Sequence, residues 1–87
     1  MPEMMARVEV EDFDRWLTNH RSQSGRRAGY GMTDGPVYRD VDDPNAAFVH
    51  LHVVDLAEAQ QWFLTEEFAR ATRDAGVLHR EFFITQS

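Results

Sequence analysis

The stretch AFVHLHVVD (residues 47–55) alternates over residues 47–53, and this alternation decides the fold. One parity carries the aliphatic residues Ala47, Val49, Leu51 and Val53, and the other carries Phe48, His50, His52 and Val54. Successive side chains of a strand point to opposite faces, so the aliphatic set predicts a face that packs against helices. We therefore expect Phe48 and the two histidines to lie on the other face of a sheet, away from the helices.

The residues before this strand predict a strand, a helix and a second strand. Residues 4–10 alternate apolar and charged side chains, which is typical of a half-buried strand. Asp12 is placed to cap a helix whose apolar stripe runs from Phe13 to His20, and the Ser- and Gly-containing segment 22–29 predicts a loop. Residues 30–40 predict an edge strand that is bulged near Pro36, because proline cannot donate to a sheet.

The residues after the strand predict a second helix and a last strand. Asp55 and Glu58 form a capping box, and Thr65 indicates that the helix breaks and restarts there. Gly76 favours a left-handed helix end, and residues 77–85 are rich in strand formers. In this last strand both faces carry a charge and an aromatic ring, so the side that faces the helices stays open.

This order of elements predicts a single α+β domain over residues 1–87 with the ferredoxin-like βαββαβ fold. Right-handed crossovers place two helices on one face of an antiparallel sheet with strand order 4-1-3-2. A chain of 87 residues buries only a marginal core, and its helix-free face would expose an apolar patch. We therefore expect a homodimer that pairs sheet against sheet and encloses a cavity.

The composition argues against several classes of function. The net charge is −6, with 15 acidic residues against 9 basic ones, all of them arginine, so binding to nucleic acid or to a membrane surface is disfavoured. The cluster Arg21, Arg26 and Arg27 is expected to be a solvated part of the 22–29 loop. There is no cysteine, no apolar run of about 20 residues and no secretory pattern in MPEMMARVEV, which predicts a cytoplasmic protein.

Three stretches resemble the dimeric α/β-barrel superfamily, which includes the antibiotic-biosynthesis-type monooxygenases. They are VEDFDRW (10–16), VYRDVDDPNAAFVHLHVVDLAEAQQWF (37–63) and EFARATRDAGV (67–77). The resemblance implies a homodimer with a pocket between sheet and helices or inside the barrel. Some relatives oxidise polycyclic aromatics without a cofactor, some cyclise polyketides and some bind haem. The shared residues form turns, caps and packing contacts, so the resemblance assigns no catalytic motif to particular positions.

His50 and His52 are the first candidates for chemistry. Either could act as a general base that removes a proton from an acidic phenol or enol, and we predict a catalytic role for this pair. Phe48, Tyr30, Trp62 and His79 are predicted to contact a small apolar or aromatic ligand. Packing is the ordinary role of such aromatic residues, and Trp62 could instead anchor the dimer interface. Arg80 either holds an anionic substrate or forms a salt bridge.

Two further functions stay open for the histidine pair. Imidazoles two residues apart on a strand can share one metal ion if a third ligand completes the set. His79 and Glu81 are expected two strands away in the same sheet and could approach the pair only across a dimer. Alternatively the histidines only fill the interface of a non-catalytic dimer. The preferred prediction is a small-molecule-binding protein, with no cofactor or metal, that is either an oxygenase or cyclase or no enzyme at all.

Overall fold

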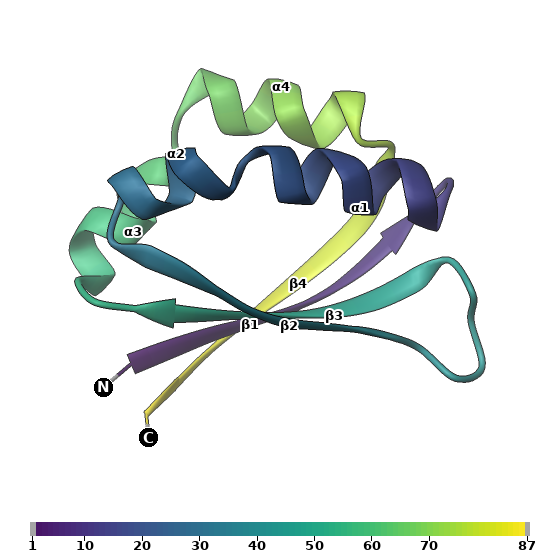
Figure 1. Ribbon diagram of the computed structural model, residues 1–87, viewed down its shortest axis with the longest axis horizontal. Coiled ribbons are helices and arrows are strands. Elements are labelled where there is room, and N and C mark those ends of the chain that lie inside the picture. The colour runs from purple at the N-terminus through teal and green to yellow at the C-terminus, as the bar shows by residue number, and fades with distance from the viewer. Residues whose placement is uncertain (1, 87) are drawn as a thin grey trace.

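The computed structural model describes residues 2–86 and contains one four-stranded sheet with helices on one side (Figure 1). Its elements are β1 (Pro2–Val10), α1 (Phe13–Ser22), α2 (Ser24–Gly29), β2 (Met32–Arg39), β3 (Ala46–Val53), α3 (Leu56–Trp62), α4 (Glu66–Asp74) and β4 (Val77–Gln86). The strands pair antiparallel in the order β2-β3-β1-β4. The predicted ferredoxin-like sheet, with the proline-containing strand on an edge, is confirmed. We call its helix-free side the open face.

The alternation in β3 sorts its side chains as predicted. The aliphatic positions are buried under the helices, whereas Phe48, His50 and His52 belong to the open face. The pairing of β1 with β4 shows which residues of β4 face the helices, a question that the sequence did not answer. Ala6 pairs with Phe82 and Val8 with Arg80, and paired residues of antiparallel strands share a face, so Phe82 and Arg80 lie on the helix side.

The prediction of a solvated loop over residues 22–29 is wrong. Residues 24–29 form helix α2, and Arg27 is buried within it with 5% of its surface exposed. Its guanidinium donates to both carboxylate oxygens of Asp34 in β2, at 2.7 and 2.8 Å, and to the carbonyl of His20 at 2.6 Å. A bidentate pair of this kind holds α2 against β2. It thereby stabilises a short helix that the serine and glycine residues of the segment would not favour on their own.

The predicted helix caps are confirmed. The side chains of Asp12, Asp55 and Thr65 accept hydrogen bonds from backbone amides in the first turns of α1, α3 and α4. The break at Thr65 therefore divides the expected second helix into α3 and α4, and Gly76 ends α4 with a φ of 73°. None of the helices within residues 2–86 is long and apolar enough to span a membrane.

The bulge predicted in the edge strand is also present. The register between β2 and β3 shifts between Asp34 and Val37, so that Gly35 and Pro36 lie opposite the single residue His50. The backbone approaches β3 closely at this point. A Cβ atom added to Gly35 would lie 2.8 Å from the carbonyl oxygen of His50, which is closer than van der Waals contact allows. Only glycine fits this position.

We predict that Gly35→Ala lowers the free energy of unfolding by about 1–3 kcal/mol, because the strands must separate to admit the methyl group. Urea unfolding followed by circular dichroism measures the change. Gly25→Ala in α2 is the matched control, since nothing lies within 4 Å of an added Cβ there. It should leave stability equal or raise it by up to about 1 kcal/mol. Equal stabilities for the two variants would contradict the close approach.

Candidate functional site

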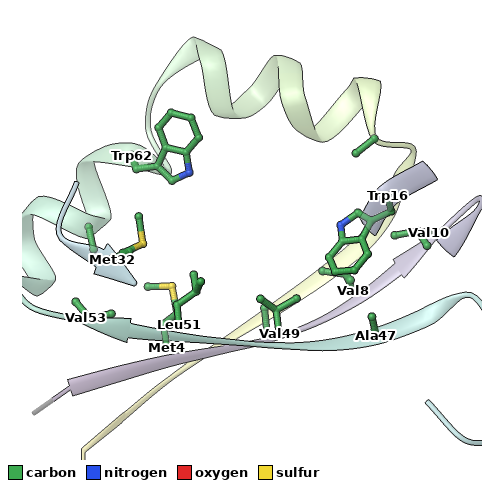
Figure 2. Close-up of a cluster of buried hydrophobic side chains, with 13 residues drawn as sticks. Met4, Val8, Val10, Trp16, Met32, Ala47, Val49, Leu51, Val53 and Trp62 are labelled. Carbon is green, nitrogen blue, oxygen red and sulfur yellow. The ribbon is translucent and has the colours of Figure 1, made fainter. Parts of the chain in front are cut away.

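A cavity of about 60 Å³ lies between the helices and the sheet. Its aromatic wall consists of Trp16, Trp62, Phe63, Phe68 and Phe82, and its polar lining of Asn19, His20, Gln23, Arg27, Thr72 and Arg80. Figure 2 shows Trp16 and Trp62 on the helix side of the sheet, above the aliphatic side chains of β1 and β3. An apolar cavity with a few convergent polar groups is the usual form of a small-molecule site.

A second hollow, of about 150 Å³, lies above the cavity between α1, α2 and α4. It shares Asn19, Gln23 and Ala71 with the cavity, and an ion pair between Arg26 and Glu67 bounds it. Both partners of this pair are exposed, so the pair contributes little to stability. The hollow and the cavity therefore adjoin at these three residues.

Arg80 is the cation of the cavity. Its guanidinium lies 4.8 Å from the ring centre of Phe68 and 5.6 Å from that of Phe82, and it donates to the hydroxyl of Thr72 at 3.1 Å. Burial lowers the pKa of Arg80 to about 10, so the group stays charged at neutral pH. No carboxylate within residues 2–86 forms a salt bridge with Arg80. The salt-bridge alternative is therefore excluded for this part of the chain.

His20 is the imidazole of the cavity, and sequence reasoning placed it only in the apolar stripe of the first helix. It stacks on Trp16 with the ring centres 5.1 Å apart. Burial, reinforced by the charge of Arg27, lowers the pKa of His20 to about 4. The ring is thus neutral at physiological pH and can both donate and accept a hydrogen bond. A histidine in an otherwise apolar stripe, four residues after a tryptophan, was the signal in the sequence.

The open face brings His50 and His52 together with a third residue that the sequence did not reveal. Nε2 of His50 lies 2.8 Å from one carboxylate oxygen of Glu3, and Nδ1 of His52 lies 3.0 Å from the other. The two imidazole centres are 4.7 Å apart. Hydrogen bonds from the histidines hold the pKa of Glu3 below its usual value, so this carboxylate is ionised.

The remaining predicted site residues divide between the two sides of the sheet. Tyr30 and Trp62 pack on the helix side with ring centres 5.4 Å apart, and Trp62 lines the cavity with 2% of its surface exposed. That burial within the chain leaves Trp62 no surface for a dimer interface. Phe48 and His79 lie on the open face, two strands from each other. The six predicted residues therefore do not form one site.

Comparisons with solved structures support the same fold. A protein from Nitrosomonas europaea that is provisionally described as an antibiotic biosynthesis monooxygenase superposes with a TM-score of 0.75 at 12% identity, covering 100% of this chain and 98% of its own. One of the same description from Bordetella bronchiseptica gives 0.76 at 12% identity over 99% and 95% of the chains. SnoaB, a cofactor-independent oxygenase from Streptomyces nogalater, gives 0.77 at 12% identity over 99% and 91%.

These matches confirm the resemblance at the level of the fold. The chain has the ferredoxin-like fold of the antibiotic-biosynthesis-monooxygenase-type proteins. No protein-family model matches the sequence, and neither does any curated protein. At 12% identity the fold alone is shared, and function must be argued from the residues of this chain.

We predict that acid destabilises the protein through His20. The pKa of His20 is about 4 in the folded chain, below the ordinary value of 6.5 for histidine, so the unfolded chain binds the proton more tightly. The stability that comes from keeping His20 neutral should be fully present above pH 6.5. The free energy of unfolding should then decrease as the pH drops from 6.5 toward 4. Arg27, Arg80 and Arg21 oppose the protonation of His20, and Asp34 favours it.

Urea unfolding at several pH values tests this prediction. His20→Phe should remove most of the slope between pH 6.5 and about 5, because no imidazole then has to be protonated in the cavity. Closer to pH 4 the carboxylates of Glu3, Asp34 and Asp40, whose pKa values are lowered in the folded chain, add a slope that both proteins share. His79→Phe is the matched control, since that ring is exposed on β4 and should leave the slope unchanged. An unchanged slope in His20→Phe would contradict the prediction.

Proposed function

We propose that this protein binds a small planar organic anion, an ionised phenol or enol, in the cavity between helices and sheet. The observation that carries the proposal is the mostly buried guanidinium of Arg80, which has aromatic rings beside it and no carboxylate partner within residues 2–86. A buried cation without a counter-charge is costly, and an anionic ligand would remove this cost. The rings of Phe68 and Phe82 would pack against the ligand.

A phenol or enol fits the site better than a carboxylate or phosphate. The cavity offers the guanidinium of Arg80, which has no carboxylate partner within residues 2–86, and that of Arg27, which is already paired with Asp34. Its other polar groups are neutral, among them the imidazole of His20, and the rest of its walls are aromatic and aliphatic. A delocalised anion keeps most of its surface apolar and needs few hydrogen bonds. Arg80 would lower the pKa of the bound hydroxyl, so that the site needs no strong base.

Oxygenation without a cofactor is the reaction class that this arrangement serves. An enolate or phenolate is electron-rich and can itself reduce dioxygen. When a CH₂ group of the ligand becomes a carbonyl, its carbon loses two hydrogens and gains one oxygen atom, and the second oxygen atom leaves as water. Arg80 would hold the anion and the aromatic wall would exclude water. The likeness in fold to SnoaB, a cofactor-independent oxygenase, supports this class.

The cavity is small for an organic ligand. A volume of about 60 Å³ holds a few water molecules rather than an aromatic ring, and small-molecule pockets measure roughly 300–1,000 Å³. A ligand would therefore enter through the outer hollow as α4 moves away from α1 and α2. The Arg26–Glu67 ion pair would open in that movement.

We also propose that two copies pair through the open face. Met5, Tyr38, Phe48 and Phe83 lie on this face, each from a different strand, and are between 41% and 64% exposed. Monomers rarely leave such a set of large apolar side chains in water. In this arrangement the general-base role predicted for His50 and His52 would need a second enclosed space between the two sheets.

We predict that 4-nitrophenol binds as its phenolate and that its visible absorbance reports a lowered pKa in the complex. Arg80→Met should weaken binding at least tenfold and abolish the pKa shift, because the cation that selects the anion is gone. Nitrobenzene, of the same shape but uncharged, should bind equally to both proteins. Quenching of the chain's two tryptophans, which both line the cavity, gives the affinities. Oxygen uptake with an anthrone tests the reaction class.

The double variant His50→Phe/His52→Phe distinguishes the two faces of the sheet. It should bind 4-nitrophenol as the wild type does, because neither histidine lines the cavity. Loss of binding in this variant together with full binding in Arg80→Met would overturn the cavity site and favour the predicted site on the open face.

We predict that Phe48→Asp/Phe83→Asp shifts the protein from dimer to monomer in sedimentation velocity, since two charges per copy would be buried in the interface. Leu64→Asp is the matched control, because Leu64 is exposed in the turn between α3 and α4, away from the open face. It should remain dimeric. A wild-type protein that sediments as a monomer at high concentration would contradict the proposed dimer.

A further inference from the structure

Glu3, His50 and His52 form a compact group of three metal-ligand side chains on the open face. One ligand atom from each residue lies within 4.8 Å of the other two, and no other group of this kind occurs among residues 2–86. The side chains of Glu3 and His50 are about one-fifth exposed, and that of His52 is half exposed. Within one chain the group is therefore anchored in the sheet and open on one side, which would face the second copy in the proposed dimer.

Strand geometry brings the group together. His50 and His52 project from the same side of β3, and the backbone of Glu3 pairs directly with that of His52 across the antiparallel ladder. The sheet continues on both sides, with β2 beside β3 and β4 beside β1. The three side chains thus stand on the two central strands, where backbone motion is most restricted.

The donors and their spacing match those of a transition-metal site. The two nitrogen-to-oxygen distances, 2.8 Å to one carboxylate oxygen of Glu3 and 3.0 Å to the other, are close to the roughly 3–3.5 Å that separates ligands placed about 2.0–2.2 Å from one tetrahedral ion. One ligand atom from each of the three residues lies within 4.8 Å of the others, so a small adjustment of the side chains brings them around one ion. Two neutral imidazoles and one carboxylate are a ligand set used for zinc and for non-haem iron, with the remaining positions left to water. Hard cations such as Mg²⁺ and Ca²⁺ prefer oxygen ligands and fit this set poorly.

We propose that Glu3, His50 and His52 bind a divalent transition-metal ion such as Zn²⁺ on the open face. The ion takes the place of the two histidine-to-carboxylate hydrogen bonds. Each histidine then gives a lone pair to the metal, and the half-exposed side of His52 leaves room for water in the coordination sphere. The ion lies on the opposite side of the sheet from the cavity, so it takes no part in the binding of the organic anion.

The same face carries a matched control. His79 and Glu81 on β4 also form a histidine–carboxylate pair, with Nε2 and Oε1 3.4 Å apart and both side chains about half exposed. This pair lacks the second histidine. Any binding that reflects only scattered surface histidines or the acidic charge of the protein would respond to changes at His79 as much as to changes at His52.

The experiment uses the full chain without a polyhistidine tag, stripped with EDTA and titrated with ZnCl₂ and CoCl₂. Isothermal calorimetry should give one ion per chain, and bound Co²⁺ should show the visible absorption of a four- or five-coordinate site. Glu3→Gln, His50→Gln and His52→Gln should each weaken binding at least tenfold, and His79→Gln should not change it. X-ray absorption of the zinc complex should show two imidazole ligands.

Thermal unfolding of the metal-free variants shows whether each is folded. His52 is the most exposed of the three residues, so His52→Gln should remain folded and can be tested even if another variant unfolds. No saturable binding by the wild type would overturn the proposal. So would binding that survives His52→Gln, or that His79→Gln weakens equally. The nitrophenol experiment with Arg80→Met is unaffected by any of these results, so failure of the metal site and failure of the cavity site are separate outcomes.

Discussion

The burial of one face of β3 is the constraint on which the rest of the structure depends. Val49, Leu51 and Val53 lie under the helices, and the residues between them are thereby forced to the open face. A single layer of sheet therefore separates two environments. The helix side is mainly apolar, and the open face carries ionisable groups among partly exposed aromatic side chains. Every chemical property of this chain follows from the side on which a residue lies.

The two sides hold opposite charges. On the helix side Arg80 is a cation without a carboxylate partner in residues 2–86, and the imidazole of His20 is kept neutral by burial. On the open face Glu3 is an ionised carboxylate with His50 and His52 beside it. An anion is thus favoured on one side and a cation on the other. The sheet would keep the proposed anion and the proposed metal ion apart, so neither would neutralise or displace the other.

The sequence predicted what depends on local patterns. Alternation located the strands, the side chains of Asp55 and Thr65 marked the helix starts, and Pro36 indicated an edge strand; each of these is confirmed. The site required information of another kind. Glu3 meets His52 only through the register of β1 on β3, which a pattern within one strand does not contain.

The wrong prediction of a loop at residues 24–29 also arises from a contact between segments that a local pattern does not contain. Ser and Gly residues predicted a loop, but Arg27 finds Asp34 across the β2 edge and is buried with it. Tertiary pairing of this kind overrides weak local propensity. His20 and Trp62 were likewise visible as positions on helices, yet the cavity between them exists only once α1, α3 and α4 are packed on the sheet.

The bulge at Gly35 shows how register couples both faces. With one extra residue in β2, Val37 pairs with Val49 on the helix side and Tyr38 pairs with Phe48 on the open face. Without it, each residue beyond the bulge would move to the opposite face, so that Tyr38 would enter the core and Val37 would leave it. Asp34 lies before the bulge and reaches Arg27 on the helix side. The bulge thus allows one edge strand both to anchor α2 and to supply Tyr38 to the open face, and the lack of room for a side chain at Gly35 holds it in place.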